Sequence, residues 1–384
     1  MIDLPQGFRA HVANVGIKDD TDDFVVIASD RPCHASGVFT KSLFSGASVI
    51  ISRDHLRDGR AQAVVVVSKN ANVATGDVGR ANARELAFRV ATTLGCSPRD
   101  VVVASTGVIG RQYPMDRIRA HLDVMPRPAG TDAELAARAI MTTDTHPKVV
   151  AANVAGSSAR VVGIAKGVGM IEPDMATMLA FVFTDAEIAT DELDIRFRRA
   201  VDDSFNCVSV DTDTSTSDTA VVFANGAAGP VDPEALEVAL RDVTLKLTKM
   251  IARDGEGATK MLEVVVDGAR DKAQAKRVAK AIVNSPLVKT AVHGADPNWG
   301  RVAMAIGKCS EQNDIEQEKV VIRFGDQELY PVAVGADGLE RLTQYLRGEH
   351  VTISVSLGVA DGRCTVYGCD LSEGYIRINA DYTT

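Results

Sequence analysis

The feature that most constrains the fold is a series of short, almost wholly apolar segments rich in valine and isoleucine. Residues 64–67 are four valines in succession, and 101–103 are three more. Apolar runs of this length without polar alternation are typical of strands that are covered on both faces. The pattern predicts strands at residues 24–28, 63–68, 101–105, 160–165, 178–184, 219–224, 263–266, 320–324, 352–357, 364–369 and 375–379.

Amphipathic helices alternate with these strands. In residues 80–94, Leu86, Val90 and Leu94 recur every four positions, and Gly95 is a suitable helix end. A long helix is expected to begin at Asp232-Pro233, where an N-cap residue precedes a proline. Further helices are expected at 115–124, 191–205, 271–283 and 338–346. Sheets sandwiched by helices, in an α/β or α+β layered architecture, account for this order.

Composition narrows the class of protein. The chain has 384 residues, 46% hydrophobic and 24% charged, which suits two domains or one large layered domain. Its net charge of −9 disfavours nucleic acid and anionic membranes as partners. No apolar run approaches the roughly 20 residues of a membrane helix, and the first residues lack the pattern of a signal peptide. We therefore expect a cytoplasmic protein.

The cysteines and histidines do not have the spacing of metal ligands. None of the six cysteines forms a CxxC pair, and the spacing of Cys364 and Cys369 has no matching second pair. The seven histidines show neither HxxxH nor HExxH. We expect the cysteines to be small buried hydrophobic residues, and we expect no metal site.

One candidate for chemistry is Thr177, which follows a glycine-rich turn and opens an apolar strand. Cleavage of the Ala176–Thr177 bond would release an α-amine beside the threonine hydroxyl. An α-amine has a pKa of roughly 7.7–8.0 and can act as a general base on that hydroxyl. The alternative is an ordinary threonine at the start of a strand, which β-propensity explains.

A second candidate is the Thr106-Gly107 pair after the valine-rich strand 101–105. A threonine hydroxyl and a glycine N–H are suitable donors for a developing oxyanion, although a simple turn has the same composition. A third is Glu256, which lies between Gly255 and Gly257. Its unobstructed carboxylate could bind an ammonium group, or the segment could be a solvated acidic loop.

Two further polar segments allow two interpretations each. Residues 284–301 hold the only tryptophan, Trp299, and could bind a second substrate or form a polar part of the core. Residues 211–219 carry Asp211 and Asp213 among threonines and serines. These carboxylates could bind a cation, but we favour a structural role in capping and turn formation.

Five motifs, taken together, are informative: residues 105–110, 141–145, 166–179, 254–258 and 379–384. They resemble one known family, the ornithine acetyltransferases, also called glutamate N-acetyltransferases. The resemblance runs from about residue 7 to the end of the chain, and the order and spacing of the motifs make it specific. It implies an α+β fold, a layered α-β-β-α Ntn-like sandwich with a second, smaller α/β domain.

The resemblance also implies a self-cleaving precursor. Cleavage between Ala176 and Thr177 would give chains 1–176 and 177–384, which would form an α2β2 or larger assembly. Thr177 would then carry an acetyl group from N2-acetyl-L-ornithine to L-glutamate in a ping-pong cycle without any cofactor. Thr106 and Gly107 would form the oxyanion hole. The substrate site would be lined by Thr142, Lys166, Thr177, Glu256, Asn379 and Thr384.

These roles suit the chemistry of the side chains. Lys166 can hold a substrate carboxylate, and Glu256 or the C-terminal carboxylate of Thr384 can hold an ammonium group. The sequence departs from the common family pattern at Glu172 and Asp174, where many members have small or neutral residues. Acidic residues there resemble members associated with clavulanic acid gene clusters, so arginine biosynthesis and secondary metabolism both stay open as pathways.

Two other functions also stay open. An Ntn-like amidase or aminopeptidase would use water in place of glutamate. An uncleaved binding protein would show one band on a denaturing gel.

Overall fold

The computed structural model describes residues 2–18, 20–172 and 178–381. The chain divides into two compact units. Unit 1 comprises residues 1–206 and 213–247, and unit 2 comprises residues 207–212 and 248–382. None of the helices in the described part of the chain is long and apolar enough to cross a membrane.

Unit 1 contains an eight-stranded sheet in the order β4-β3-β2-β8-β7-β6-β5, with β1 paired to β2. The β3–β4 and β7–β8 pairs are parallel, and the other pairs are antiparallel. The strands are β1 (Phe8–Ala13), β2 (Phe24–Phe39), β3 (Arg60–Val67), β4 (Val101–Ser105), β5 (Lys148–Asn153), β6 (Arg160–Lys166), β7 (Leu179–Thr184) and β8 (Thr219–Ala224).

The long strand β2 joins two halves of this sheet. Its first part pairs with β3 and its last part with β8, and its register shifts between Ala28 and Cys33. An irregularity of this kind bends a strand. The two halves then share one apolar core, to which β3 contributes Val64 and β7 contributes Phe181.

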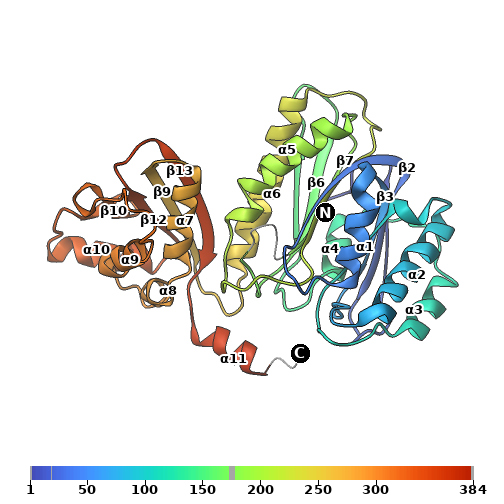
Figure 1. Cartoon of the computed structure of the whole chain (residues 1–384), viewed down its shortest axis with the longest axis horizontal. Coiled ribbons are helices and arrows are strands. Elements are labelled where there is room, and N and C mark those ends of the chain that lie inside the picture. The colour runs from blue at the N-terminus through green and yellow to red at the C-terminus, as the bar shows by residue number, and fades with distance from the viewer. Residues whose placement is uncertain (1, 19, 173–177, 382–384) are drawn as a thin grey trace. The chain divides into compact units, whose positions relative to one another are not determined.

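Helices cover the outer sides of the two halves. The strands β2, β3 and β4 pack against α1 (Ala47–His55), α2 (Gly76–Leu94) and α3 (Met115–Leu122). The other half of the sheet has α5 (Thr190–Asp202) and α6 (Pro233–Arg253) on its outer side, beside β6 and β7, as Figure 1 shows. The helix α4 (Ala133–Ala139) contributes alanines to the shared core. The predicted layers of helix, sheet, sheet and helix are therefore confirmed.

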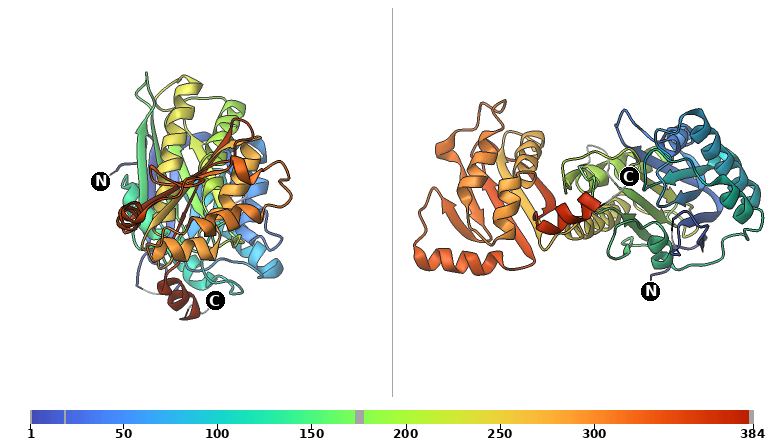
Figure 2. Two further views of the ribbon diagram at one scale, coloured as in Figure 1. Left: turned by 90° about the vertical axis from the view of Figure 1, so that its left-hand side faces the viewer. Right: turned by 90° about the horizontal axis from the view of Figure 1, so that it is seen from below.

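Unit 2 is the smaller domain that the sequence predicts. Its five-stranded sheet has the order β11-β10-β12-β9-β13, and only its β12–β9 pair is parallel. Four helices share one apolar core with this sheet, and Figure 2 gives two further views of them. The elements are β9 (Met261–Ala269), α7 (Lys272–Val283), α8 (Pro286–His293), α9 (Trp299–Gly307), β10 (Val321–Phe324), β11 (Gln327–Tyr330), α10 (Ala336–Leu346), β12 (His350–Ser356), β13 (Gly362–Cys369) and α11 (Glu373–Asp381).

One predicted strand is wrong, because residues 375–379 belong to the helix α11. The Ser372 hydroxyl accepts a hydrogen bond from the Gly374 N–H at 3.0 Å, and Glu373 pairs with Arg377 one helical turn later. This capping and pairing outweigh the β-branched isoleucines that suggested a strand. The remaining predicted strands are present, those at 101–105 and 219–224 with the predicted bounds and the others with shifted ends. Short 3₁₀ turns occur at Leu56–Asp58, Pro98–Asp100, Phe205–Cys207 and Gln317–Lys319.

The cysteines behave largely as predicted. All six are free thiols and five are buried, whereas Cys96 is only partly buried. The described residues contain no group of three or more histidine, cysteine, aspartate or glutamate side chains that could hold a metal ion.

Candidate active site

In unit 1, the Thr106-Gly107 pair lies directly after β4 and against the loop that follows β3. The Thr106 N–H donates to the Val67 carbonyl at 3.2 Å. Gly107 has a φ of +125°, and a Cβ at this position would lie 2.3 Å from the carbonyl carbon of Lys69. Only glycine permits both this backbone conformation and this close approach. The turn is therefore fixed in place by backbone contacts on both sides.

The loop against which Gly107 packs is itself strained. Lys69, Asn72 and Ala74 all have positive φ angles, of 70°, 50° and 55°. Non-glycine residues rarely adopt this region, and such outliers cluster at functional sites. The buried Asn72 side chain holds the loop by donating to the Gly79 carbonyl at 3.0 Å. The strained loop makes this turn a candidate functional site.

The end of β4 is also held by a buried network of hydroxyl groups. The Ser105 hydroxyl contacts the hydroxyl groups of Ser48 and Tyr113, which lie 3.1 Å from each other. Burial raises the pKa of the Tyr113 phenol, so this network is neutral. It anchors Thr106 without adding charge.

Lys166 ends the strand β6 and brings a charge to Thr106. Its Nζ lies 3.4 Å from the Thr106 Oγ1 and donates to it, across 60 positions of the chain. The side chain is 10% exposed. Two residues that the sequence predicts for the site are thus in direct contact.

A third residue, Asp144, connects the parts of this cluster, and its side chain is fully buried. Its Oδ1 accepts from the Lys148 Nζ at 2.8 Å and from the Gly167 N–H at 2.7 Å. Its Oδ2 accepts from the Thr142 N–H at 3.2 Å and lies 4.0 Å from the Lys166 Nζ.

The charge of Asp144 is set by opposing effects. Burial alone would raise the pKa of Asp144, but the ammonium groups of Lys166 and Lys148 lower it below its usual value. The carboxylate is therefore ionised. Sequence reasoning missed this residue, although it lies in the motif at 141–145, because nothing in the sequence marks it as buried between two lysines.

The predicted cleavage position, Ala176 and Thr177, lies outside the described residues. The residues on either side of it are held by the segment 211–219. The Glu172 N–H donates to the Asp213 carbonyl at 3.1 Å, and the Thr219 N–H donates to the Met178 carbonyl at 3.0 Å. These contacts agree with the structural role that we favour for this segment.

In unit 2, the predicted residues Glu256 and Asn379 are in contact. The Asn379 Nδ2 donates to the Glu256 Oε2 at 2.9 Å. Gly257 has a φ of +69°, and a Cβ there would lie 2.3 Å from the Tyr375 backbone nitrogen. The glycine therefore lets the acidic loop approach the start of α11. Thr384, the other residue predicted from the end of the chain, lies outside the described residues.

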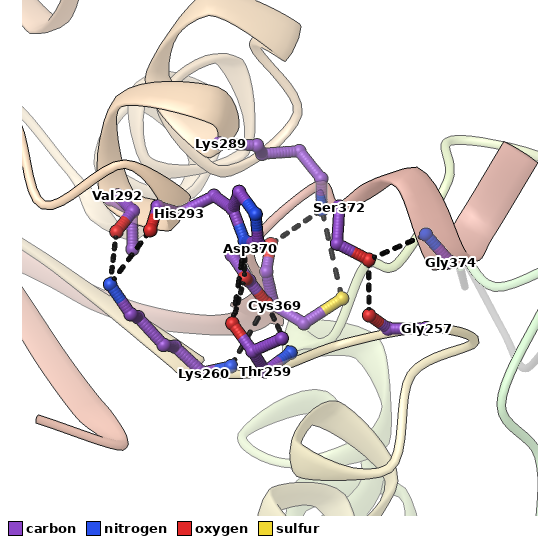
Figure 3. A network of polar contacts seen from close by, with 10 residues as sticks. All are labelled: Gly257, Thr259, Lys260, Lys289, Val292, His293, Cys369, Asp370, Ser372 and Gly374. Atoms are coloured by element: carbon purple, nitrogen blue, oxygen red, sulfur yellow. Dashed lines mark hydrogen bonds and ion pairs between the residues drawn. The ribbon is translucent and has the colours of Figure 1, made fainter. Parts of the chain in front are cut away.

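The acidic loop is anchored by a buried carboxylate, Asp370 (Figure 3). Asp370 accepts from the N–H groups of Thr259 and Lys260 at 2.8 and 2.9 Å, and its Oδ2 lies 2.7 Å from the His293 Nδ1. Burial would raise the pKa of Asp370, but the hydrogen bonds from Thr259 and His293 lower it. The Ser372 hydroxyl adds a bond to the Gly257 carbonyl.

Two buried lysines complete the network in Figure 3. The Lys260 Nζ donates to the carbonyls of Val292 and His293 at the end of α8, at 2.7 and 3.0 Å. The Lys289 Nζ donates to the carbonyls of Val210 and Cys369 at 2.9 and 2.6 Å. Of the two, Lys260 lies at the C-terminus of α8, where the negative end of the helix dipole stabilises a positive charge.

The segment 284–301 forms α8 and the start of α9. Lys289 gives it the character of a polar part of the core. Trp299 stacks on Tyr330 at 5.0 Å between ring centroids and lines a cavity of about 460 Å³. No contact of the described residues assigns this segment to a second substrate.

The predicted site residues therefore form two groups in the described structure. Thr106, Gly107, Thr142 and Lys166 come together in unit 1 around Asp144. Glu256 and Asn379 come together in unit 2.

Comparison with known proteins identifies the family. A model described as the ArgJ family matches residues 9–384. The chain belongs to the ArgJ family. This match, together with the relatives described next, confirms the family that the motifs predict, ornithine acetyltransferase, and the expectation of an acetyltransferase that acts on small molecules.

Individual relatives cover almost the whole chain. The chain is 58% identical over 387 aligned residues to the glutamate N-acetyltransferase Oat2 of Streptomyces clavuligerus, which covers 99% of this chain and 98% of the relative. It is 56% identical over 381 residues to the arginine biosynthesis bifunctional protein ArgJ 2 of Nostoc sp., with the same coverage. A crystal structure of the arginine biosynthesis bifunctional protein ArgJ of Bacillus halodurans matches with a TM-score of 0.51 and 43% identity, over 54% of this chain and 100% of that chain.

Proposed function

We propose that this ArgJ family member cuts itself between Ala176 and Thr177 and then transfers an acetyl group from N2-acetyl-L-ornithine to L-glutamate. The observation that supports this most directly is the contact of the Lys166 ammonium with the Thr106 hydroxyl, at 3.4 Å. In this proposal the ammonium would bind a substrate carboxylate, and the hydroxyl would donate to the oxyanion. The names of two relatives, a glutamate N-acetyltransferase and an arginine biosynthesis protein, agree with this activity.

In the cleavage step, the Thr177 hydroxyl attacks the Ala176 carbonyl and the peptide bond to the Thr177 nitrogen breaks. The resulting ester is hydrolysed by water. This releases the carboxylate of Ala176 and leaves Thr177 with a hydroxyl and a new α-amine. The products are the chains 1–176 and 177–384.

The two chains would remain associated after cleavage. The strand β7 of the second chain pairs with β6 of the first over the register from Lys166↔Leu179 to Val161↔Thr184. The strand β8 of the second chain pairs with β2 of the first. Separating the chains would break both ladders and expose the core that the two sheet halves share, so the cleaved unit 1 stays intact.

In the transfer step, the Thr177 hydroxyl attacks the acetyl carbonyl of acetyl-ornithine while the α-amine of Thr177 takes its proton. The Thr106 hydroxyl and the Gly107 N–H stabilise the oxyanion. Ornithine leaves with the proton, and Thr177 keeps the acetyl group as an ester. The amine of glutamate then attacks this ester by the same steps in reverse, which releases N-acetylglutamate.

Substrate recognition would divide between charges of opposite sign. Lys166 and Thr142 would bind the α-carboxylate that both substrates carry. Glu256, oriented by Asn379, would bind the side-chain ammonium of ornithine, with the C-terminal carboxylate of Thr384 as an alternative.

We further propose a cytoplasmic α2β2 or larger assembly of the two chains, which light scattering of the purified protein would test.

The test is mass spectrometry of the purified protein followed by product analysis. We expect two chains, with threonine at the N-terminus of the second, and a single full-length chain for Thr177→Ala. Incubation with acetyl-ornithine alone should add one acetyl group to the chain 177–384. Glutamate should then remove the acetyl group as N-acetylglutamate.

Three results would contradict the proposal. A full-length chain that is fully active would exclude self-cleavage. Release of acetate in place of N-acetylglutamate would favour the amidase. Transfer to an amine other than glutamate would favour an acyltransferase of secondary metabolism.

A further inference from the structure

The Thr106-Gly107 turn keeps two hydrogen-bond donors available. The Gly107 N–H has no hydrogen-bond partner among residues 2–18, 20–172 and 178–381. The Thr106 hydroxyl accepts from the Lys166 Nζ at 3.4 Å, and because an ammonium group can only donate, the hydroxyl keeps its own hydrogen for another acceptor. Two donors on adjacent residues can act on one oxygen only if the turn holds them in a fixed geometry.

The loop that follows β3 holds this turn through its backbone. The Val108 N–H donates to the Lys69 carbonyl at 3.4 Å, and the Ala71 N–H donates to the Val108 carbonyl at 3.0 Å. Asn70 lies between these two contacts and forms backbone bridges with Thr106 and Val108. Asn70 is therefore at the centre of the contact between the loop and the turn.

The side chain of Asn70, which is 5% exposed, joins the same two segments a second time. Its Oδ1 accepts from the Asn72 N–H at 2.9 Å, which makes an Asx turn within its own loop. Its Nδ2 donates to the Gln112 carbonyl at 3.0 Å, beyond the Thr106-Gly107 turn. One partner can only donate and the other can only accept, so these contacts fix the orientation of the amide.

Gln112 is itself held in place by its side chain. Its Nε2 donates to the Thr75 carbonyl at 2.8 Å, and its Oε1 accepts from the Asn82 Nδ2 at 3.4 Å. These contacts join amides and a backbone carbonyl and include no charged group. The carbonyl to which Asn70 donates is therefore a fixed anchor.

The position of Asn70 is transmitted directly to Gly107. A Cβ on Gly107 would lie 2.3 Å from the Lys69 carbonyl carbon and 2.7 Å from the Asn70 nitrogen. The Gly107 α-carbon therefore packs on the peptide bond between Lys69 and Asn70. A displacement of this peptide bond would move the Gly107 N–H.

We propose that Asn70 is a positioning residue, which holds the Gly107 N–H and the Thr106 hydroxyl so that both donate to one oxyanion. Asn70 does not touch the substrate in this arrangement. It acts through the turn, by joining its own loop to Gln112 on the far side of Gly107. The proposal rests on the proposed role of Thr106 and Gly107 as oxyanion donors.

The test is Asn70→Ser, measured on fully cleaved protein. The serine hydroxyl can still accept from the Asn72 N–H, but it is one bond shorter and loses the contact with the Gln112 carbonyl. We expect kcat to fall about 10- to 100-fold, since small displacements of catalytic groups have effects of this size. The KM for acetyl-ornithine should stay within about twofold, because the oxyanion donors act in the transition state.

Asn82→Ser is the matched control. Asn82 is another buried asparagine of the same network, with 9% exposure, but its side chain donates to the side chain of Gln112. It should lower the thermal midpoint about as much as Asn70→Ser and leave kcat nearly unchanged. A merely structural role of Asn70 would give both variants the same small change in kcat, and the positioning role would be wrong.

Asn70→Ser combined with Thr106→Ala tests whether the two residues act together. The rate losses of independent sites multiply, since their free energies add. Because both changes act on the same pair of donors, the double variant should lose less than the product of the two single losses. If the losses multiply, or if Asn70→Ser raises only the KM, the positioning role is wrong.

Asn70→Asp is the second variant if Asn70→Ser does not fold or stays uncleaved. It has the shape of asparagine and keeps the acceptor for Asn72, but it replaces the donor to Gln112 with an oxygen. We expect the same loss of kcat at nearly unchanged KM. If neither variant folds and cleaves, Asn70 serves the stability of unit 1 and the positioning role is overturned.

Thr106→Ala separates this proposal from the proposed function. If Thr106→Ala keeps the kcat of the unchanged enzyme, the oxyanion role of Thr106 fails, and the positioning role of Asn70 fails with it. If Thr106→Ala loses kcat while Asn70→Ser keeps it, only the role of Asn70 is overturned.

Discussion

Two buried carboxylates, Asp144 in unit 1 and Asp370 in unit 2, are compensated by different means. Both side chains are 0% exposed. Asp144 is neutralised mainly by two ammonium groups. Asp370 accepts from two backbone N–H groups and the Thr259 hydroxyl, and it also contacts the imidazole of His293 (Figure 3).

The lysines differ in the same way. Lys148 and Lys166 face a carboxylate, whereas Lys260 and Lys289 donate to backbone carbonyls. Backbone dipoles are fixed by the fold, so the network in unit 2 anchors a loop. In unit 1, by contrast, Lys166 also contacts the hydroxyl of Thr106, the proposed oxyanion donor. We therefore expect changes around Thr106 and Asp144 in unit 1 to alter the rate of transfer, and changes at the unit 2 network to alter stability and ground-state binding.

The largest effect is expected in unit 1, at Thr106. Thr106→Ala removes a donor that acts on the oxyanion, and such a loss typically costs roughly 100- to 1,000-fold in turnover, about 3–4 kcal/mol. The KM should change little, because the interaction strengthens only in the transition state. Steady-state kinetics on fully cleaved protein measures both constants.

Thr106→Ser is the matched control, since it keeps the hydroxyl group and loses only a methyl group. It should keep most of the activity. A Thr106→Ala variant that raised only the KM would show that Thr106 binds the ground state, and the contrast between the two units would lose its main support.

The next effect is expected in unit 2, at Asp370. Asp370→Asn removes the charge that strengthens hydrogen bonds to Thr259 and Lys260, and we expect the free energy of unfolding of unit 2 to fall by about 2 kcal/mol. Calorimetry would measure the loss, and hydrogen exchange should increase at residues 257–260. The kcat of transfer should change little, in contrast to Thr106→Ala. If kcat falls as far as in Thr106→Ala, the two units do not differ in this way.

A smaller effect is expected at Glu256, which is only partly buried. Glu256→Gln should raise the KM for acetyl-ornithine several-fold, because an exposed charge-assisted contact is weaker than a buried one. Self-cleavage should proceed as before. Glu373→Gln is the control, because Glu373 lies on α11 and its side chain is 81% exposed. Equal loss of cleavage and transfer in Glu256→Gln would indicate a folding role.

The sequence predicts an element well when the residues of that element alone determine it. The strands at 101–105 and 219–224 have their predicted bounds, because each is a continuous apolar run between polar residues. The strand β2 is longer than predicted, since exposed Asp30 and Arg31 interrupt its apolar pattern and the strand continues beyond a shift of register. The prediction of a strand at 375–379 is wrong, because the cap at Ser372 favours a helix more strongly than the isoleucines favour a strand.

The candidate site residues also divide into those that a local motif identifies and those that depend on distant partners. Thr106, Gly107 and Lys166 were identified through motifs, and the structure places Lys166 against Thr106. Asp144 was missed because it lies in a loop and its contacts depend on burial and on Lys166, which ends the strand β6. Asp370 gave no signal, since its partners are 77 to 111 positions away.

The smallest effect is expected from a pair of histidines in unit 1. His11 and His121 have their Nε2 atoms 3.0 Å apart and their rings stacked. Burial lowers the pKa of both imidazoles from 6.5, and for His11 the neighbouring His121 lowers it further. The folded state therefore favours the neutral rings. The unfolded chain binds protons first as the pH falls, so this contribution is intact above about pH 6.5 and is lost below it.

We expect the thermal midpoint of unit 1 to fall between pH 7.5 and pH 5.5, and the fall to be smaller in a His11→Gln, His121→Gln double variant. The comparison of the two proteins at both pH values removes the contribution of carboxylates that titrate in each of them. His146→Gln is the control, because His146 is an exposed histidine of the same unit. If the double variant loses as much stability on acidification as the unchanged protein, the pair does not sense pH, and the acid sensitivity of unit 1 originates at its carboxylates.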